Sequence, residues 1–408
     1  MLIGVEMKNL SIVIPAYNEE SGIKEIVERV LATTGSLEGV DVRLLELLVV
    51  DDCSRDGTAQ ITSEMAEQHE QLRLIRHAQN KGYGGALKTG FSQAQGDLIG
   101  FLDADGTYPP EYFPQLCQAA MNGKDLVVGS RMAGTSSQMP VTRRVGNLFF
   151  ASLLSLLGRQ RISDSASGMR VFKRSVLERI YPLPDGLNLT PVMSTRAIHE
   201  GIQMAEIPIP YSERVGRSKL SVVRDGSIFL QSMIWTVMSY NPVRVFGILG
   251  LIGLGFASFL LGGLVVTRLS GVTTIGPWGV AALFASLVLA QAGVGIFALG
   301  VTFNYLVSLF YKQPIRQGLF GTPIFSRSID HHFGWVGLAV AFTGLVMAGI
   351  SLFLSMQGWE IARLWLYLLG SSLLILTGMQ LVVYWILLRV LDELSQRENL
   401  VERDLVAS

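Results

Sequence analysis

The C-terminal part of the 408-residue chain contains four long segments without a charged side chain. A helix of about 20 apolar residues spans the roughly 30 Å hydrocarbon core of a bilayer. Four such segments in series are improbable as buried helices of a soluble fold. We therefore expect four membrane spans, at about residues 244–267, 279–304, 334–356 and 364–388.

Aromatic and basic residues near these segments predict how they lie in the membrane. Four tryptophans are close to the predicted ends, as interfacial aromatics are: Trp278, Trp335, Trp359 and Trp365. The loop at residues 305–333 carries more basic residues than the other short loops, which predicts a cytoplasmic position for it. An even number of spans then places the N-terminal domain and a tail at residues 391–408 in the cytoplasm, with the spans in the cytoplasmic cell membrane.

Composition excludes several classes of function. The 33 basic and 33 acidic side chains balance, so no nucleic-acid partner is expected. Cys53 and Cys117 are the only cysteines, which argues against a disulfide framework and fits a reducing compartment. The N-terminus lacks a basic stretch followed by an apolar one, so we expect no cleaved signal peptide.

The N-terminal half has the pattern of an α/β domain. Short apolar runs predict strands at residues 10–15, 44–50, 72–76, 98–102 and 126–128. The segments between them predict helices, among them one at about residues 20–34. This alternation is typical of a doubly wound sheet, which binds its ligands at the carboxyl ends of the strands. We expect the fifth strand, which leads into Arg131, to lie beside the fourth, which leads into Asp103.

Two carboxylates follow the fourth predicted strand directly. Asp103 and Asp105 are one residue apart, and Gly106, Pro109 and Pro110 then turn the chain. Neighbouring acids repel unless a cation or ligand shares them, and their oxygens suit Mg²⁺ or Mn²⁺ together with a substrate phosphate. A solvated acidic turn is the alternative.

A glycine cluster at residues 80–86 opens a predicted helix. Its glycines permit close approach of a ligand, and a helix N-terminus favours phosphate. Four histidines match no motif, and we expect structural or surface positions for them: His77, His199, His331 and His332.

Five motifs in this order and spacing resemble the inverting glycosyltransferases of family 2, which have a GT-A fold. They are IVIPAYNEE, VVDDCSRDGT, NKGYGGA, FLDADGTYPPE and VVGSR. The resemblance covers about residues 10–215 and implies a nucleotide-sugar donor, linked to UDP or GDP. The residues that it assigns to the donor are Pro15, Tyr17, Glu19, Asp51, Asp52, Lys81, Asp103, Ala104 and Asp105. It also implies that Asp103 and Asp105 hold the metal, and that they and Arg131 are the catalytic residues.

Two later segments, DSASGMR at residues 164–170 and RVGRSKL at 214–220, resemble the polyprenyl-phosphate glycosyltransferases of the dolichyl-phosphate mannose synthase type. This resemblance implies a polyprenyl or dolichyl phosphate as acceptor and the lipid bilayer as a partner. The residues that it assigns to the acceptor phosphate are Arg131, Arg143, Asn147, Arg214 and Lys219.

Residues 143–158 predict an amphipathic helix with a wide apolar sector, and residues 221–242 predict a second. Two arginines lead the first helix, which favours a position in the membrane interface, although an ordinary core helix is the alternative. We therefore divide the chain into a GT-A domain at residues 1–220, an interfacial helix at 221–242 and a transmembrane domain at 243–390.

The predicted activity is metal-dependent, inverting transfer of a monosaccharide to the phosphate of a polyprenyl phosphate. A processive polysaccharide synthase and a lipid-linked sugar carrier or flippase are the alternatives. The synthases carry a Gln-x-x-Arg-Trp motif, and Gln231 to Trp235 lacks the arginine. Gly106 and Thr107 follow Asp105 where mannose synthases commonly have Leu-Gln, which favours a UDP-hexose or UDP-N-acetylhexosamine donor over GDP-mannose.

Overall fold

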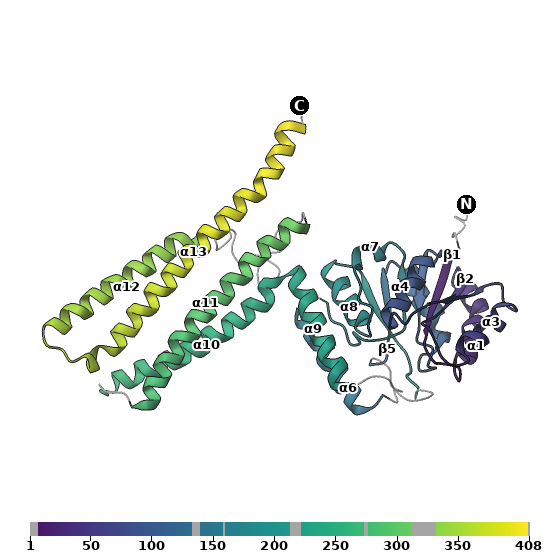
Figure 1. Ribbon diagram of the computed structural model, residues 1–408, viewed down its shortest axis with the longest axis horizontal. Helices are drawn as coiled ribbons and strands as arrows, with labels where there is room; N and C mark the ends of the chain where they lie inside the picture. Colours follow the sequence, from purple (N-terminus) through teal and green to yellow (C-terminus); the bar gives the residue numbers. More distant parts are fainter. Residues whose placement is uncertain are drawn as a thin grey trace. The chain divides into compact units, whose positions relative to one another are not determined.

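The computed structural model describes residues 7–132, 139–157, 160–212, 222–272, 276–311 and 332–406. The chain divides into two compact units, Met1–Val237 and Met238–Ser408. Figure 1 shows the elements of both units.

The first unit contains a seven-stranded sheet with helices on both faces (Figure 1). The strands are β1 (Lys8–Ala16), β2 (Val42–Asp51), β3 (Leu72–Arg76), β4 (Leu98–Phe101), β5 (Leu126–Ser130), β6 (Arg170–Lys173) and β7 (Met204–Pro208). The helices are α1 (Ile23–Ala32), α2 (Thr34–Glu38), α3 (Thr58–Ala66), α4 (Tyr83–Gln93), η1 (Pro110–Tyr112), α5 (Phe113–Met121), α6 (Val141–Leu157), α7 (Val176–Ile180), α8 (Leu189–His199) and α9 (Val222–Tyr240).

The strand order corrects one expectation from the sequence. The order is β3-β2-β1-β4-β6-β5-β7, so β6 separates β4 from β5 and pairs antiparallel with both. Val171 lies opposite Gly100 on one side and Val127 on the other. The β5 strand is therefore not the neighbour of β4, because a later segment of the chain fills the place between them. The remaining strand pairs are parallel, which makes the sheet mixed.

Alternating side chains of the strands divide the core into two layers. Ile12 and Ile14 of β1 pack with residues of α1, α2, α3 and α5, whereas Val13 packs with residues of α4, α7 and α8. This is the two-sided burial expected of strands that read as continuous apolar runs. Helices on both faces leave the carboxyl ends of the strands as the edge where the loops meet.

Helices α6 and α9 each turn one face to the protein and an apolar face outward. On α6, Asn147, Ala151 and Leu154 are buried, whereas Val145, Leu148 and Phe149 are exposed. On α9, Met233 and Val237 are fully buried. The outward face of α9 includes Val223, 84% exposed, and Trp235, 61% exposed. The apolar sector of α6 is thus outside the core, the reverse of what an ordinary core helix would show.

The second unit consists of α10 (Pro242–Leu269), α11 (Pro277–Tyr311), α12 (Phe333–Met356) and α13 (Ile361–Val406). Each contains a segment that is long and apolar enough to cross a membrane. The segments are Pro242–Leu269, Pro277–Ser308, Phe333–Met356 and Arg363–Leu391. The basic residues on which we based the orientation, from Lys312 to Arg327, lie outside the described residues.

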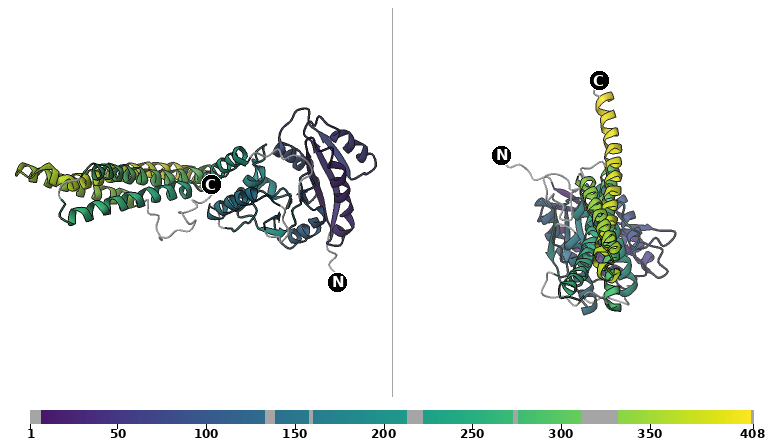
Figure 2. Two further views of the ribbon diagram at one scale, coloured as in Figure 1. Left: turned by 90° about the horizontal axis from the view of Figure 1, so that it is seen from below. Right: turned by 90° about the vertical axis from the view of Figure 1, so that its left-hand side faces the viewer.

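Small residues set the packing within this unit. A methyl group on Gly250 of α10 would lie 2.7 Å from the carbonyl oxygen of Gly293 on α11. A methyl group on Gly337 of α12 would lie 2.8 Å from the carbonyl oxygen of Gly378 on α13. Such close backbone approach is the usual device of membrane helix pairs. The Gln291 side chain donates a hydrogen bond to Gln380, which joins α11 to α13. Figure 2 gives two further views of these helices.

Candidate active site

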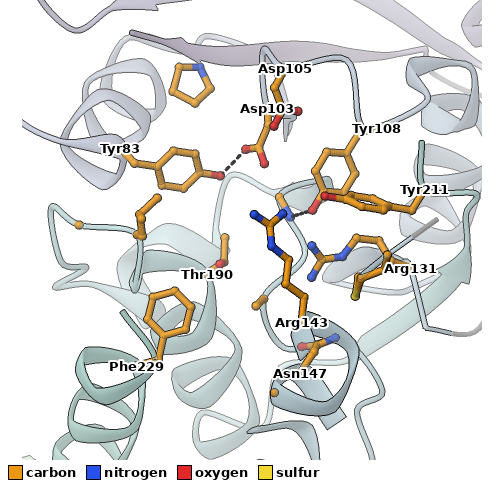
Figure 3. Close-up of a pocket in the computed structure, with 18 of the residues that line it drawn as sticks. Tyr83, Asp103, Asp105, Tyr108, Arg131, Arg143, Asn147, Thr190, Tyr211 and Phe229 are labelled. Carbon is orange, nitrogen blue, oxygen red and sulfur yellow. Dashed lines mark hydrogen bonds between the residues drawn. The ribbon is translucent and has the colours of Figure 1, made fainter. Parts of the chain in front are cut away.

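A cavity of about 1090 Å³ opens at the carboxyl ends of the strands in the first unit. It contains ten of the residues assigned from the sequence: Pro15, Tyr17, Glu19, Asp52, Asp103, Ala104, Asp105, Arg131, Arg143 and Asn147. Asp51 and Lys81 are not among its lining residues, and Arg214 and Lys219 lie outside the described residues. Figure 3 shows the two carboxylates of the β4 loop on one side and the arginines on the other.

The two carboxylates after β4 are each oriented by a neighbouring hydroxyl. The Tyr83 hydroxyl donates a hydrogen bond of 2.7 Å to Oδ1 of Asp103 (Figure 3). The Thr107 hydroxyl donates one of 2.6 Å to Oδ1 of Asp105. Burial and the Asp103 carboxylate raise the pKa of Tyr83 well above its ordinary value. The phenol therefore stays protonated at neutral pH and acts as a donor.

Asp52 lies at the end of β2 and organises the loop that precedes α4. Its Oδ1 accepts a hydrogen bond from the backbone N–H of Lys81 at 2.8 Å, and its Oδ2 accepts one from Gly82 at 2.8 Å. Lys81 thus contributes its backbone N–H to this contact, and the residue as a whole is exposed. Asp51 is fully buried beneath the loop and accepts a hydrogen bond from the backbone N–H of Ser54.

His77, which matches no motif, is buried directly behind Asp52. Its Nδ1 lies 2.7 Å from Oδ1 of Asp52, and its Nε2 lies 2.9 Å from the Thr89 hydroxyl on α4. The carboxylate is an acceptor only, so Nδ1 carries the proton. His77 therefore positions Asp52, a residue of the cavity. The sequence hinted at this role only by placing His77 three residues before Asn80, the start of the NKGYGGA motif.

The glycines at the start of α4 pack closely against another loop of the chain. A methyl group on Gly84 would overlap the Pro184 carbonyl oxygen, and one on Gly82 would lie 2.7 Å from the Asp185 carbonyl oxygen. Gly85 donates its backbone N–H to Asp185 at 3.0 Å. These glycines therefore admit the loop between α7 and α8, while Gly82 also lines the cavity, where we expected a ligand to approach. That loop then supplies Gly186 and Leu187 to the cavity wall.

Arg131 is held in one orientation at the far side of the cavity. Its Nε and Nη2 donate to the two oxygens of Asp164, both at 2.8 Å. Its guanidinium carbon lies 5.8 Å from the ring centre of Tyr108 and 5.5 Å from that of Tyr211. Asn147 on α6 also donates to Asp164, at 3.0 Å. The predicted acceptor residues Arg131 and Asn147 are thus joined through a carboxylate to which the sequence analysis gave no role.

The remaining wall of the cavity is apolar. Arg143 reaches from α6 into the cavity between Tyr83 and Arg131 (Figure 3). Around it lie apolar residues of α6, of the α7–α8 loop and of α9: Val145, Phe149, Phe150, Leu187 and Phe229. Asn188 of the α7–α8 loop donates a hydrogen bond of 2.7 Å to Ser232 of α9. The cavity is therefore polar near Asp103 and Asp105 and apolar on the side formed by α6, α9 and the α7–α8 loop.

Sequence reasoning missed several residues of the cavity: Tyr83, Tyr108, Thr190, Tyr211 and Phe229. Tyr83 and Tyr108 stand inside the NKGYGGA and FLDADGTYPPE motifs, so their positions were in view without an assigned role. Thr190, Tyr211 and Phe229 come from elements that only the fold brings to the cavity.

The donor set fits a hard divalent cation. Asp103 and Asp105 both line the cavity, and carboxylate oxygens are ligands that Mg²⁺ and Mn²⁺ prefer. No cluster of three or more His, Cys, Asp or Glu side chains that could hold a metal occurs in the described part of the chain. A cation here would take two protein ligands and complete its shell with phosphate oxygens and water, which is the usual arrangement for Mg²⁺.

The sheet brings paired carboxylates at a strand end and arginines to one cavity, an arrangement that suits a ligand with phosphate groups. Comparison with known proteins gives the family. The family described as glycosyl transferase family 2 matches residues 11–181. An undecaprenyl-phosphate 4-deoxy-4-formamido-L-arabinose transferase of Photorhabdus laumondii is 31% identical over 77% of this chain and 94% of its own. The chain belongs to glycosyl transferase family 2 and is a membrane-associated glycosyltransferase.

Other comparisons cover smaller parts. A dolichyl-phosphate hexose transferase of Haloferax volcanii is 31% identical over 55% of this chain and 92% of its own. The glucosyl-3-phosphoglycerate synthase structure from Mycobacterium tuberculosis covers 56% of this chain and 78% of its own, with 20% identity and a TM-score of 0.46. A domain of unknown function (DUF8752) matches residues 242–402.

Proposed function

We propose that the protein transfers a monosaccharide from a nucleotide sugar to the phosphate of a polyprenyl phosphate and inverts the anomeric carbon. Two relatives bear names that state transfer to such a carrier, an undecaprenyl phosphate in one and a dolichyl phosphate in the other. One of them is matched along 94% of its length, so its likeness is not confined to the nucleotide-binding region.

The observation that carries the proposal is the set of residues that line one cavity. Asp103 and Asp105 stand on one side, Arg131 and Arg143 on the other, and an apolar wall from α6, α9 and Leu187 adjoins the arginines. A donor diphosphate with a metal fits the carboxylates. An acceptor phosphate fits the guanidinium groups, which form charge-assisted hydrogen bonds with phosphate oxygens. The apolar wall suits the first units of an isoprenoid.

A divalent cation, Mg²⁺ or Mn²⁺, belongs to this proposal. Asp103 and Asp105 would hold it, with Tyr83 and Thr107 orienting their carboxylates. When bound, the cation neutralises the charge that develops on the leaving diphosphate.

The chain's own residues bind and orient the two substrates. An oxygen of the acceptor phosphate attacks the anomeric carbon from the face opposite the leaving group. A new carbon–oxygen bond forms while the bond to the nucleoside diphosphate breaks. A phosphate monoester has its second pKa at about 6, so the attacking oxygen is already ionised at neutral pH and needs no general base. Arg131 and Arg143 align that oxygen by binding the others.

The finer parts of the proposal concern the donor and the membrane. We propose a UDP-linked hexose or N-acetylhexosamine as donor, because Gly106 and Thr107 replace the Leu-Gln pair common in mannose synthases. We also propose that residues 1–220 form the catalytic domain on the cytoplasmic side and that α6 and α9 lie in the membrane interface. Residues 243–390 would anchor the enzyme in the cytoplasmic membrane, with residues 391–408 as a cytoplasmic tail.

The test is a transfer assay with the purified full-length protein, undecaprenyl phosphate and a panel of radiolabelled UDP- and GDP-sugars. We expect one donor to give a radiolabelled lipid in the presence of Mg²⁺ or Mn²⁺. Excess chelator and Asp105→Ala should each abolish the product, while Asp105→Ala remains folded because its side chain is on a partly exposed loop. Binding of nucleotide sugar without transfer to lipid would instead favour a carrier.

A further inference from the structure

The loop at residues 163–168, which precedes β6, is held from two sides through its backbone. Glu206 on β7 accepts hydrogen bonds from the N–H groups of Ser163 and Asp164, both at 2.9 Å. Arg170 donates to the carbonyl oxygens of Ser165 at 2.8 Å and Ser167 at 3.0 Å. Burial lowers the pKa of Arg170 to about 10, which leaves the guanidinium charged at neutral pH. Hydrogen bonds to its backbone thus hold the loop at both ends.

Asp164 projects from this loop and is fully buried. It accepts the backbone N–H of Arg131 at 3.0 Å, besides the two guanidinium hydrogen bonds and the one from Asn147. Arg131 and Asn147 line the cavity, whereas Asp164 stands behind them. One carboxylate thus connects the end of β5 to α6.

The geometry leaves the Arg131 guanidinium a single orientation. Asp164 holds one edge of the plane, and the rings of Tyr108 and Tyr211 lie within 5.8 Å of its central carbon. Arginine's fork is planar, so fixing one edge also fixes the direction of the other. Figure 3 shows Arg131 and Arg143 converging on the same part of the cavity.

The same loop also borders the carboxylate side of the cavity. Gly168 lies so close to Asp103 that a methyl group on it would overlap the Asp103 carboxylate. Its backbone N–H donates a hydrogen bond of 2.7 Å to the Tyr108 hydroxyl. One short loop therefore carries both Asp164, which orients Arg131, and Gly168, which faces Asp103.

We propose that Asp164 is a positioning residue for the acceptor phosphate. It acts through Arg131, because its two hydrogen bonds fix where the phosphate-binding edge of that guanidinium stands relative to Asp103. This inference rests on the proposed function, because it assumes that Arg131 meets the phosphate of the lipid. A merely stabilising ion pair would affect folding without a selective effect on that phosphate.

The experiment measures ligand binding to the full-length protein in lipid nanodiscs. The probes are undecaprenyl phosphate, undecaprenol as the same lipid without phosphate, and UDP and GDP for the donor side. The variants are Asp164→Asn, Arg131→Ala and their combination. We expect each single variant to lower the affinity for undecaprenyl phosphate at least about tenfold, since charge-assisted hydrogen bonds are lost or misdirected. Undecaprenol and nucleotide binding should stay within about twofold of wild type.

The double variant decides whether Asp164 acts through Arg131. Residues that act as one unit show non-additive effects. The double variant should therefore bind undecaprenyl phosphate as tightly as Arg131→Ala alone does. Full additivity of the two losses, or wild-type affinity of a folded Asp164→Asn, would overturn the proposal.

A milder variant covers the case in which Asp164→Asn does not fold. Glu206→Gln weakens the hydrogen bonds to the Asp164 backbone without leaving a buried charge unpaired. Glu178→Gln, at an exposed position of α7, is its control. We expect about a threefold loss of undecaprenyl phosphate affinity that disappears in the Arg131→Ala background. No loss would contradict the inference. A wild-type protein that binds undecaprenyl phosphate no better than undecaprenol would contradict the proposed function instead.

Discussion

His77 and Asp52 form a buried pair, with Nδ1 of the histidine 2.7 Å from Oδ1 of the carboxylate and each side chain 4% exposed. The same carboxylate holds the backbone N–H groups of Lys81 and Gly82. His77, which lies outside every motif, thereby fixes Asp52, which lies inside one. Through Asp52 it also fixes the loop that precedes α4.

Replacing His77 by alanine should weaken nucleotide binding. The variant removes a hydrogen bond to a buried charged group, worth about 1.5–3 kcal/mol, and frees the loop that Asp52 holds. Titration of UDP and GDP against the purified variant measures the effect. His69→Ala, at an exposed position, is the control and should bind as wild type does. Unchanged nucleotide affinity of a folded His77→Ala would show that Asp52 needs no support.

Tyr83→Phe should weaken the affinity for the divalent cation and so raise the Mn²⁺ concentration that transfer requires. The phenol orients a predicted metal ligand, and loss of such a partner typically costs about 10- to 100-fold in metal affinity or activity. The measurement is the Mn²⁺ concentration that gives half-maximal transfer. Tyr181→Phe removes a hydroxyl from a residue that is 37% exposed, and its Mn²⁺ dependence should not change. If both variants need the same Mn²⁺ concentration for half-maximal transfer, Tyr83 does not orient a metal ligand.

Arg143 and its neighbour Arg144 provide a matched pair. Arg143 lines the cavity, whereas Arg144 is exposed on the next position of α6. Arg143→Ala should lose a charge-assisted hydrogen bond to the acceptor phosphate, about 1.5–3 kcal/mol or roughly 10- to 150-fold. Separate titrations of nucleotide sugar and undecaprenyl phosphate in the transfer assay locate the loss. A loss confined to the nucleotide sugar, or an equal loss in Arg144→Ala, contradicts the assignment.

Gly84→Ala should destabilise the first unit. The added methyl group would overlap the Pro184 carbonyl oxygen, and such overpacking costs about 1–3 kcal/mol. Gly35→Ala is the control, because nothing lies within 4 Å of the position of its new methyl group. Thermal unfolding of the full-length variants with and without UDP compares the two. Equal midpoints would mean that the α7–α8 loop can move away from α4 at little cost.

Much of the site was predictable because its residues lie in continuous motifs. Asp103 and Asp105 follow one apolar strand, and Tyr17, Glu19 and Asp52 follow two others, so parallel pairing brings them to one edge of the sheet. Asp164 was visible in the sequence, but nothing local showed that its partner is Arg131. The two are 33 positions apart and meet only because β6 returns between β4 and β5.

Local patterns in the sequence specify several elements of this chain. These are the apolar strands, the helices with one outward apolar face and the four segments long enough to cross a membrane, since periodicity and length decide them. Tertiary structure decided everything that depends on which segments become neighbours. It placed β6 beside β4, the Pro184–Asp185 loop against the glycines of α4, and His77 behind Asp52. Packing between distant segments selects these arrangements, and a pattern confined to a short stretch of chain carries no information about them.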